Sequence, residues 1–257
     1  MFITANVTQA ASPFAPEQEG LSTGSGFVIG KGGSIAIGST MGDMPTRIKH
    51  CGITSIGDAH LAAEAGAWAL GMIFWPGSPR RCELDEAQLI AAALRRTVHL
   101  TGVFVNARLE QIDLTVQAAG LDFVQLHGDE GPIFCAEVAR RTGAKVIKAV
   151  RVRSRATLQA AAAFHSDFLL LDAHVEGVPG GTGQTIDWAL VREAKLRAPV
   201  ILSGGLNAAN VAEAIAAAQP FAVDVASGTE AAPGIKDPEK LQAFYEAVRR
   251  PTVARAP

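Results

Sequence analysis

The feature that most constrains this chain is a repeat that runs from about residue 47 to residue 250. A short apolar run, a turn and an Ala/Leu-rich helical stretch recur eight times. Near-continuous apolar runs separated by helices are typical of parallel strands covered on both faces. The runs, in order, are RIKHC (47–51), AWALGMIF (67–74), VHLTGVFV (98–105), LDFVQLH (121–127), KVIKAV (145–150), DFLLLD (167–172), PVILSGG (199–205) and FAVDVAS (221–227).

Eight such units in about 200 residues predict a single α/β domain, a closed (β/α)8 or TIM barrel, over residues 46–250. A doubly wound open sheet is the alternative, but its strand count would be unusually high and no GxGxxG follows the first run. Residues 1–45 are rich in Gly, Ser, Thr and Pro without a helical period, so we expect a flexible extension, with Met44 as an alternative start. Residues 251–257 form a C-terminal tail in this interpretation.

Composition excludes several partner classes. The formal net charge is −2 and no long basic run occurs, which gives no electrostatic case for nucleic acid or an anionic membrane. Three cysteines without a CxxC pair argue against a disulfide framework and a cysteine zinc site, and no two histidines have a helical ligand spacing. The N-terminus lacks a basic segment followed by an apolar stretch. We therefore expect a cytoplasmic protein without a bound metal.

In a (β/α)8 barrel the chemistry takes place at the carboxyl ends of the strands. Cys51 ends the first apolar run and shares a strand face with Lys49, so His50 is expected to point outward toward the helices. Asp172 ends the sixth run, where apolar surroundings can raise a carboxyl pKa and make it an acid. Arg80, in the loop WPGSPR, is suited to binding a carboxylate with two hydrogen bonds. The alternatives are a helix N-cap or loop-bracing role for Asp172 and a solvated surface role for Arg80.

Other polar groups fall at the same edge. Gln125 and His127 share a face at the end of the fourth run, and Asp224 lies in the eighth. Three glycine-rich segments follow the last strands, GVPGGTGQT (177–185), SGGL (203–206) and ASGTEAAPG (226–234). Glycine lets several backbone N–H groups approach one anion, so this cluster predicts a phosphate site, whereas the plainer interpretation is a set of tight turns.

Nine segments together resemble the phosphoribosylanthranilate isomerase family. In order they are KHCGIT, GMIFWPGSPR, GVFVN, VQLHGDE, IKAV, LLLDA, GGTGQTIDW, LSGGLNAANV and FAVDVASGTEAAPGIKD. The resemblance runs from about Lys49 to Arg249 and does not cover the first 45 residues. Two departures are His50, where an aliphatic residue is expected, and Gln184, where some relatives carry Lys.

The resemblance implies an Amadori rearrangement of N-(5-phosphoribosyl)anthranilate to 1-(2-carboxyphenylamino)-1-deoxyribulose 5-phosphate in tryptophan biosynthesis, without metal or cofactor. It implies that Cys51 is the general base, Asp172 the general acid and Arg80 the ligand of the anthranilate carboxylate. The resemblance also implies that Asp224 lines the pocket. Gln125 and His127, at the end of the fourth run, are further expected substrate contacts. The implied phosphate ligands are Gly180, Gly181, Thr182, Gly183, Ser203, Gly204, Gly205, Ser227 and Gly228.

Two questions stay open at this point. A free thiol titrates near 8.5, so Cys51 needs either its surroundings or the cationic intermediate to become a base. The alternatives to the enzyme are another phosphosugar barrel, such as a ProFAR isomerase-like or indole-glycerol-phosphate synthase-like enzyme, and a non-catalytic phosphosugar-binding barrel. The expected partner is a small phosphosugar, and the expected assembly a monomer or a homodimer.

Overall fold

The computed structural model describes residues 46–172, 188–194 and 196–250. The predictions for residues 1–45 and 251–257 lie outside this range, as do the phosphate ligands predicted at 180–183. Within the described residues, no helix is long and apolar enough to cross a membrane.

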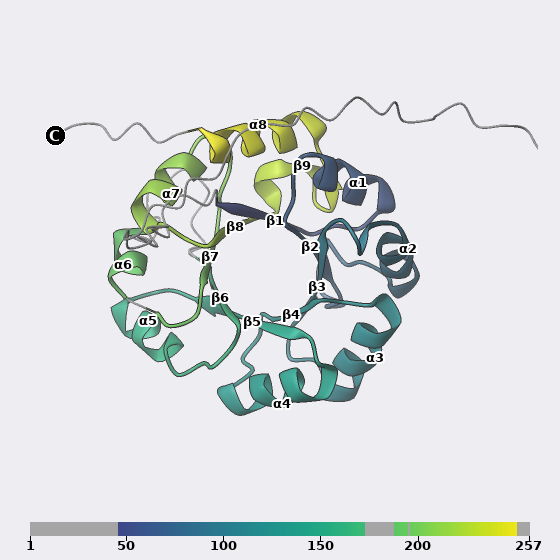
Figure 1. Cartoon of the computed structure of the whole chain (residues 1–257), viewed down its shortest axis with the longest axis horizontal. Helices are drawn as coiled ribbons and strands as arrows, with labels where there is room; N and C mark the ends of the chain where they lie inside the picture. The colour runs from purple at the N-terminus through teal and green to yellow at the C-terminus, as the bar shows by residue number, and fades with distance from the viewer. Residues whose placement is uncertain (1–45, 173–187, 195, 251–257) are drawn as a thin grey trace, which may run out of the picture. The chain divides into compact units, whose positions relative to one another are not determined.

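Eight parallel strands close into a barrel, as the repeat predicted. Each strand pairs with the next in sequence, and β1 pairs with β8 to close the ring (Figure 1). The predicted runs extend one to three residues beyond most strands because turn residues flank them. The strands are β1 Arg47–Cys51, β2 Ala69–Ile73, β3 His99–Phe104, β4 Phe123–Leu126, β5 Lys145–Arg151, β6 Phe168–Asp172, β7 Val200–Ser203 and β8 Ala222–Val225.

Helices follow the strands and form the outer layer of the ring (Figure 1). Local signals set their ends. The Ser55 and Asp237 side chains accept hydrogen bonds from first-turn N–H groups, and Gly120 and Gly143 end two helices in the left-handed conformation. The helices are α1 Ile56–Glu64, α2 Leu84–Leu94, α3 Leu109–Ala119, α4 Pro132–Thr142, α5 Arg155–Ala161, α6 Trp188–Glu193, α7 Val211–Ala218 and α8 Pro238–Arg249.

Three short elements after β8 were not predicted. After β8 the chain makes a 3-10 turn, η1 (Ser227–Thr229), and then a short antiparallel hairpin, β9 (Glu230–Ala232) with β10 (Ile235–Lys236). The sequence predicted only a glycine-rich loop over residues 226–234. Its strands are two to three residues long, and such lengths carry no alternating pattern that sequence reasoning can detect.

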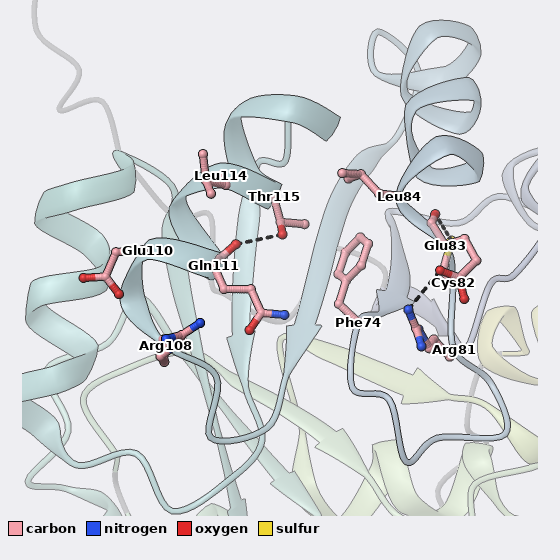
Figure 2. Close-up of a pocket in the computed structure, with 10 residues that line it drawn as sticks. All are labelled: Phe74, Arg81, Cys82, Glu83, Leu84, Arg108, Glu110, Gln111, Leu114 and Thr115. Carbon is pink, nitrogen blue, oxygen red and sulfur yellow. Dashed lines mark hydrogen bonds and ion pairs between the residues drawn. The ribbon is translucent and has the colours of Figure 1, made fainter.

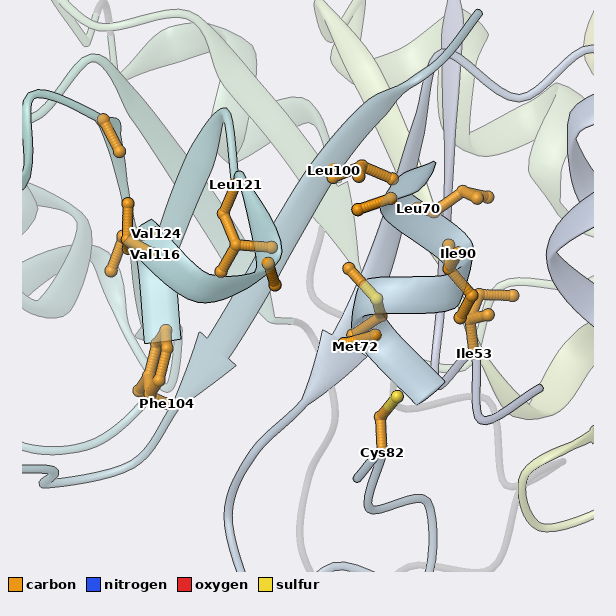
Figure 3. Packing of buried hydrophobic residues seen from close by; sticks show 14 of the residues in the cluster. Ile53, Leu70, Met72, Cys82, Ile90, Leu100, Phe104, Val116, Leu121 and Val124 are labelled. Atoms are coloured by element: carbon orange, nitrogen blue, oxygen red, sulfur yellow. The ribbon is translucent and has the colours of Figure 1, made fainter. Parts of the chain in front are cut away.

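Apolar packing fills the space between the barrel and its helices. Around β2 to β4 the buried side chains include Leu70, Met72, Leu100 and Phe104, all at most 1% exposed (Figure 3). A separate cluster closes the amino-terminal end of the barrel, where Trp68 contacts the rings of Phe123, Phe168 and Phe221. Polar groups in the barrel therefore gather at the carboxyl end of the strands.

Candidate active site

The first strand places Lys49 and Cys51 on the inner side of the barrel. Lys49 is fully buried, and its Nζ lies 2.7 Å from Oδ1 of Asp224 on the neighbouring strand β8. Cys51 pairs in register with Gly71 of β2. A Cβ at position 71 would lie 2.9 Å from Cys51 Sγ and 3.0 Å from Lys49 Nζ. The missing side chain of Gly71 therefore gives the thiol and the ammonium room to lie beside each other.

Burial and charge act on Cys51 in opposite directions. Burial raises the pKa of the Cys51 thiol, and the Lys49 ammonium opposes that effect through its charge and a hydrogen bond. The net pKa lies above its ordinary value. Burial likewise lowers the pKa of Lys49, but attraction to Asp224 and Cys51 outweighs burial and raises the net value. Lys49 therefore remains an ammonium beside the thiol.

His50 lies on the outer side of β1, as strand alternation predicted. Its ring packs edge-on against Phe244 of α8, with 6.2 Å between the centroids. Neither ring nitrogen has a hydrogen-bond partner among the described residues. Burial, with the charges of Lys236 and Lys49, lowers the pKa of His50 from 6.5 to about 3. His50 is therefore a neutral packing residue.

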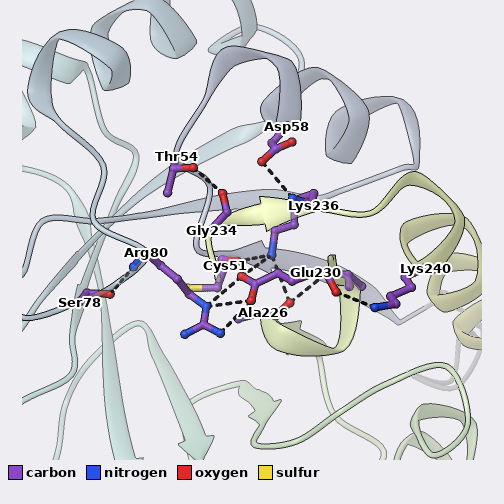
Figure 4. Close-up of polar contacts among 11 residues, drawn as sticks. Cys51, Thr54, Asp58, Ser78, Arg80, Ala226, Glu230, Gly234, Lys236 and Lys240 are labelled. Atoms are coloured by element: carbon purple, nitrogen blue, oxygen red, sulfur yellow. Dashed lines mark hydrogen bonds and ion pairs between the residues drawn. The ribbon is translucent and has the colours of Figure 1, made fainter. Parts of the chain in front are cut away.

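Arg80 is fixed by a carboxylate of this chain. Its Nε lies 2.9 Å and 3.0 Å from the two carboxylate oxygens of Glu230, and its Nη2 lies 2.8 Å from Oε2 (Figure 4). The Arg80 side chain is 24% exposed, so it is not the solvated surface residue of the alternative interpretation. Gly52 (φ +76°) makes room for the pair, since a Cβ there would lie 2.8 Å from Arg80 Cδ. The guanidinium is thus oriented before any ligand binds.

Lys236 joins this pair to the end of β1. Its Nζ donates to the backbone oxygens of Cys51 at 2.7 Å and Ala226 at 3.2 Å, and it lies 3.3 Å from Glu230 Oε1 (Figure 4). Burial lowers the pKa of Lys236. Burial alone would raise the pKa of Glu230, but Arg80 and Lys236 hold it below its ordinary value. The β9–β10 hairpin therefore connects the ends of β1 and β8 to the loop after β2.

Asp172 lies across the mouth from Cys51, because β7 and β8 separate β6 from β1 in the barrel. Its Oδ2 lies 3.6 Å from Nε2 of His127, which follows β4. The other ring nitrogen of His127 lies 3.0 Å from Nε2 of the buried Gln125. The predicted residues Gln125, His127 and Asp172 therefore form one connected group.

The loop that carries His127 is braced from outside the barrel. Glu130 accepts hydrogen bonds from the N–H groups of Gly128 at 2.8 Å and Asn106 at 2.7 Å. Lys148 lies 2.8 Å from Glu130 Oε2 and donates to the Gly128 carbonyl at 2.7 Å. Gly128 and Glu130, which follow His127, therefore hold the loop in place through this buried ion pair and its hydrogen bonds.

The predicted phosphate residues that the structure describes lie at the end of β7 and in the loops after β7 and β8. Gly204 and Gly205 both have positive φ, +99° and +65°, a backbone that favours glycine. Gly228 packs against the backbone of Leu206, so these two loops are in contact. The Ser203 hydroxyl donates to Asp224 Oδ2 at 3.1 Å. The hydroxyl is thus engaged with Asp224, which leaves the backbone of these loops as the better candidate for an anion.

Two cavities lie near the carboxyl ends of the strands. One, of about 560 Å³, is lined by residues after β3, β4 and β5 that include His127, Lys148 and Arg151. The other, of about 430 Å³, lies between the segment after β2 and helix α3 and is lined by Phe74, Arg108 and Leu114 among others (Figure 2). Only the first includes a predicted site residue.

Sequence reasoning missed the charged partners of the site. Glu230 lies in the glycine-rich segment 226–234 and Lys236 two residues after it, and both were quoted for the family resemblance without a role of their own. Lys49 was used only to assign strand parity. A signal was available in each case, because a charged residue within or beside a buried strand requires a partner. The identity of that partner was not readable from the sequence, since Lys49 and Asp224 are 175 residues apart.

Comparison with known proteins agrees with this geometry. The sequence profile described as N-(5'phosphoribosyl)anthranilate isomerase matches residues 48–247. The N-(5'-phosphoribosyl)anthranilate isomerase of Pseudomonas syringae pv. tomato is 48% identical over 204 residues, which cover 79% of this chain and 97% of that protein.

Solved structures agree as well. The Thermotoga maritima phosphoribosyl anthranilate isomerase superposes with a TM-score of 0.73 at 40% identity, covering 79% of this chain and 98% of that chain. An isomerase complex with reduced 1-(o-carboxyphenylamino)-1-deoxyribulose 5-phosphate gives a TM-score of 0.69 at 38% identity, with the same coverage. This chain therefore belongs to the N-(5'-phosphoribosyl)anthranilate isomerase family and is an isomerase.

Proposed function

We propose that the chain converts N-(5-phosphoribosyl)anthranilate to 1-(2-carboxyphenylamino)-1-deoxyribulose 5-phosphate in tryptophan biosynthesis, with Asp172 as the general acid and Cys51 as the general base. The observation that carries this assignment is the position of the two groups at the carboxyl ends of β6 and β1, three strands apart around one barrel mouth. An acid and a base on different sides of a sugar match a reaction that needs both.

The reaction has two proton transfers. Asp172 donates a proton to the furanose ring oxygen, the bond from C1′ to that oxygen breaks, and the nitrogen lone pair forms an iminium. Cys51, as the thiolate, then removes the C2′ proton, and the electrons of that bond neutralise the iminium to give an enolamine. Protonation of C1′ and loss of the enol proton give the ketone. Each step leaves the atoms and charges balanced without an oxidant.

The two ends of the substrate carry negative charge. Arg80 is the proposed ligand of the anthranilate carboxylate, because Glu230 orients the guanidinium while part of it remains exposed. Backbone N–H groups near Gly204, Gly205 and Gly228 are the proposed phosphate ligands. Support comes from the relative whose crystal structure contains a reduced carboxyphenylamino deoxyribulose phosphate.

The test is the disappearance of substrate fluorescence after phosphoribosylanthranilate is mixed with the purified chain. We expect rapid loss with the wild type and loss slowed about 10²-fold or more with Asp172→Asn, which cannot donate the proton. Asp85→Asn, an exposed carboxylate in the first turn of α2, is the matched control and should keep full activity. An inactive wild type, or an Asp172→Asn protein as fast as the control, would refute the assignment.

A further inference from the structure

The open question at this site is what makes a buried thiol serve as a base. Cys51 is 7% exposed, and burial disfavours the thiolate. The nearest strong compensation comes from Lys49, two residues earlier on the same strand face. Gly71 lets the Lys49 ammonium and the Cys51 sulfur approach the same point, because both would lie within 3.0 Å of a Cβ at that position.

The ammonium itself is held in place. Asp224 accepts from Lys49 Nζ at 2.7 Å and from Ser203 at 3.1 Å, so one carboxylate ties β1 to β7 and β8. Lys49 is fully buried, so water does not screen its charge as it would at the surface. A lysine side chain with this partner has a fixed position rather than a choice of rotamers.

Four charged groups from different elements act on the thiol. Lys49 on β1 and Lys236 on β10 favour the thiolate, and Asp224 on β8 disfavours it. Arg80, in the loop after β2, also interacts electrostatically with Cys51. The effect of Lys49 is the largest among these charges. His50 faces the helices and, being neutral, adds no charge.

We propose that Lys49 is a positioning residue that holds a positive charge beside Cys51 and so stabilises the thiolate, with Asp224 fixing the place of that charge. The thiol releases its proton to solvent, and the negative charge remains on Sγ next to the ammonium. This inference rests on the proposed role of Cys51 as the base. It adds that Lys49, two residues before the cysteine, supports the chemistry by acting on the Cys51 sulfur and not on the substrate.

The experiment titrates the thiol directly. The chain has three cysteines, so Cys82→Ala and Cys135→Ala together leave Cys51 as the single thiol, whose ultraviolet thiolate absorption is followed against pH. We expect Lys49→Met to raise the titration midpoint by about one unit or more, which is about tenfold less thiolate at a given pH. Asp224→Asn removes a negative charge that disfavours the thiolate, but it also removes the ion pair that favours the Lys49 ammonium, so this variant serves as the reference for a double variant.

Lys49→Met leaves the buried Asp224 carboxylate without its charged partner and can therefore misfold. The double variant Lys49→Met/Asp224→Asn removes both charges and avoids this problem. It should have a midpoint above that of Asp224→Asn, since it differs only by the missing ammonium. Circular dichroism establishes that each variant is folded. Equal midpoints in the double variant and in Asp224→Asn would overturn the inference, whether or not Lys49→Met folds.

The titration also separates this inference from the proposed function. Its readout needs no substrate, so it reports on Lys49 even if Cys51 is not the base. Turnover by Cys51→Ala tests the proposed function alone. If Cys51→Ala is inactive and the midpoints do not move, only the role of Lys49 is wrong. If the midpoints move and Cys51→Ala is active, the charge effect is real and the proposed function is wrong.

Discussion

Replacement of His50 by leucine offers a quantitative prediction about stability. The ring is buried, and folding lowers its pKa from 6.5 to about 3. Between these two values the unfolded chain binds a proton that the folded chain does not. The free energy of unfolding therefore decreases as the pH falls through this window. His50→Leu removes the titrating group and keeps a side chain of similar size against Phe244.

The magnitude follows from the shift. One pKa unit corresponds to about 1.4 kcal/mol. A pH of about 5 lies about 1.5 units below the pKa of His50 in the unfolded chain. His50 therefore lowers the free energy of unfolding of the wild type by about 2 kcal/mol at this pH, relative to about pH 7.5. His50→Leu avoids this loss. At about pH 7.5 the variant should already be more stable by about 1 kcal/mol or more, because two ring nitrogens without described partners are gone.

The assay is urea unfolding at both pH values, followed by circular dichroism. The wild type should lose about 2 kcal/mol more than His50→Leu between them. His60→Leu, which removes an exposed histidine of α1, is the matched control and should behave as the wild type. Turnover of His50→Leu should be unchanged, because the ring lies on the outer side of β1. An equal pH loss in the wild type and His50→Leu would refute the reasoning.

Three further outcomes follow from the site. Gly71→Ala should reduce turnover at least tenfold, because its Cβ would lie 2.9 Å from Cys51 Sγ and 3.0 Å from Lys49 Nζ; overpacking of this kind costs about 1–3 kcal/mol. Glu230→Gln should raise KM about tenfold, or about 1.4 kcal/mol, with a smaller change in kcat, because Arg80 loses its charged partner. In a pH–rate profile, kcat/KM should keep increasing at pH values above the ordinary pKa of a thiol, because burial raises the pKa of Cys51.

The Gly71→Ala and Glu230→Gln predictions each have a matched control variant. Gly131→Ala should leave activity unchanged, because its Cβ would meet no atom within 4 Å. Glu83→Gln removes an exposed carboxylate that contacts Arg81 and should leave KM unchanged. A Gly71→Ala enzyme as active as Gly131→Ala, or unaltered KM in Glu230→Gln, would contradict the geometry. If kcat/KM already reached its plateau at pH values below the ordinary pKa of a thiol, the upward direction of the Cys51 pKa shift would be contradicted.

The barrel was predictable because its signal is repeated. Eight apolar runs separated by helices allow few architectures, and strand alternation alone placed His50 outside and Cys51 inside. The β9–β10 hairpin was not predictable, since its strands are two to three residues long and lack an apolar pattern. Periodicity detects packing against a core, and this hairpin is held by charged groups instead.

The site was predictable as a set of positions but not as a set of contacts. Cys51, Asp172 and Arg80 were identified from strand ends, and the structure brings Asp172 next to His127 and Arg80 next to Glu230. Pairs of this kind join residues up to 175 positions apart. Their existence follows from the cost of burying an isolated charge, but their identity depends on barrel register.

The most direct test of the central claim is the initial rate of Cys51→Ala with phosphoribosylanthranilate, measured by loss of substrate fluorescence and compared with the wild type. Removal of the general base predicts a rate lower by about 10²-fold to 10⁴-fold, with the circular dichroism spectrum unchanged. A rate within a few-fold of the wild type would contradict the account, because another group would then have to remove the C2′ proton.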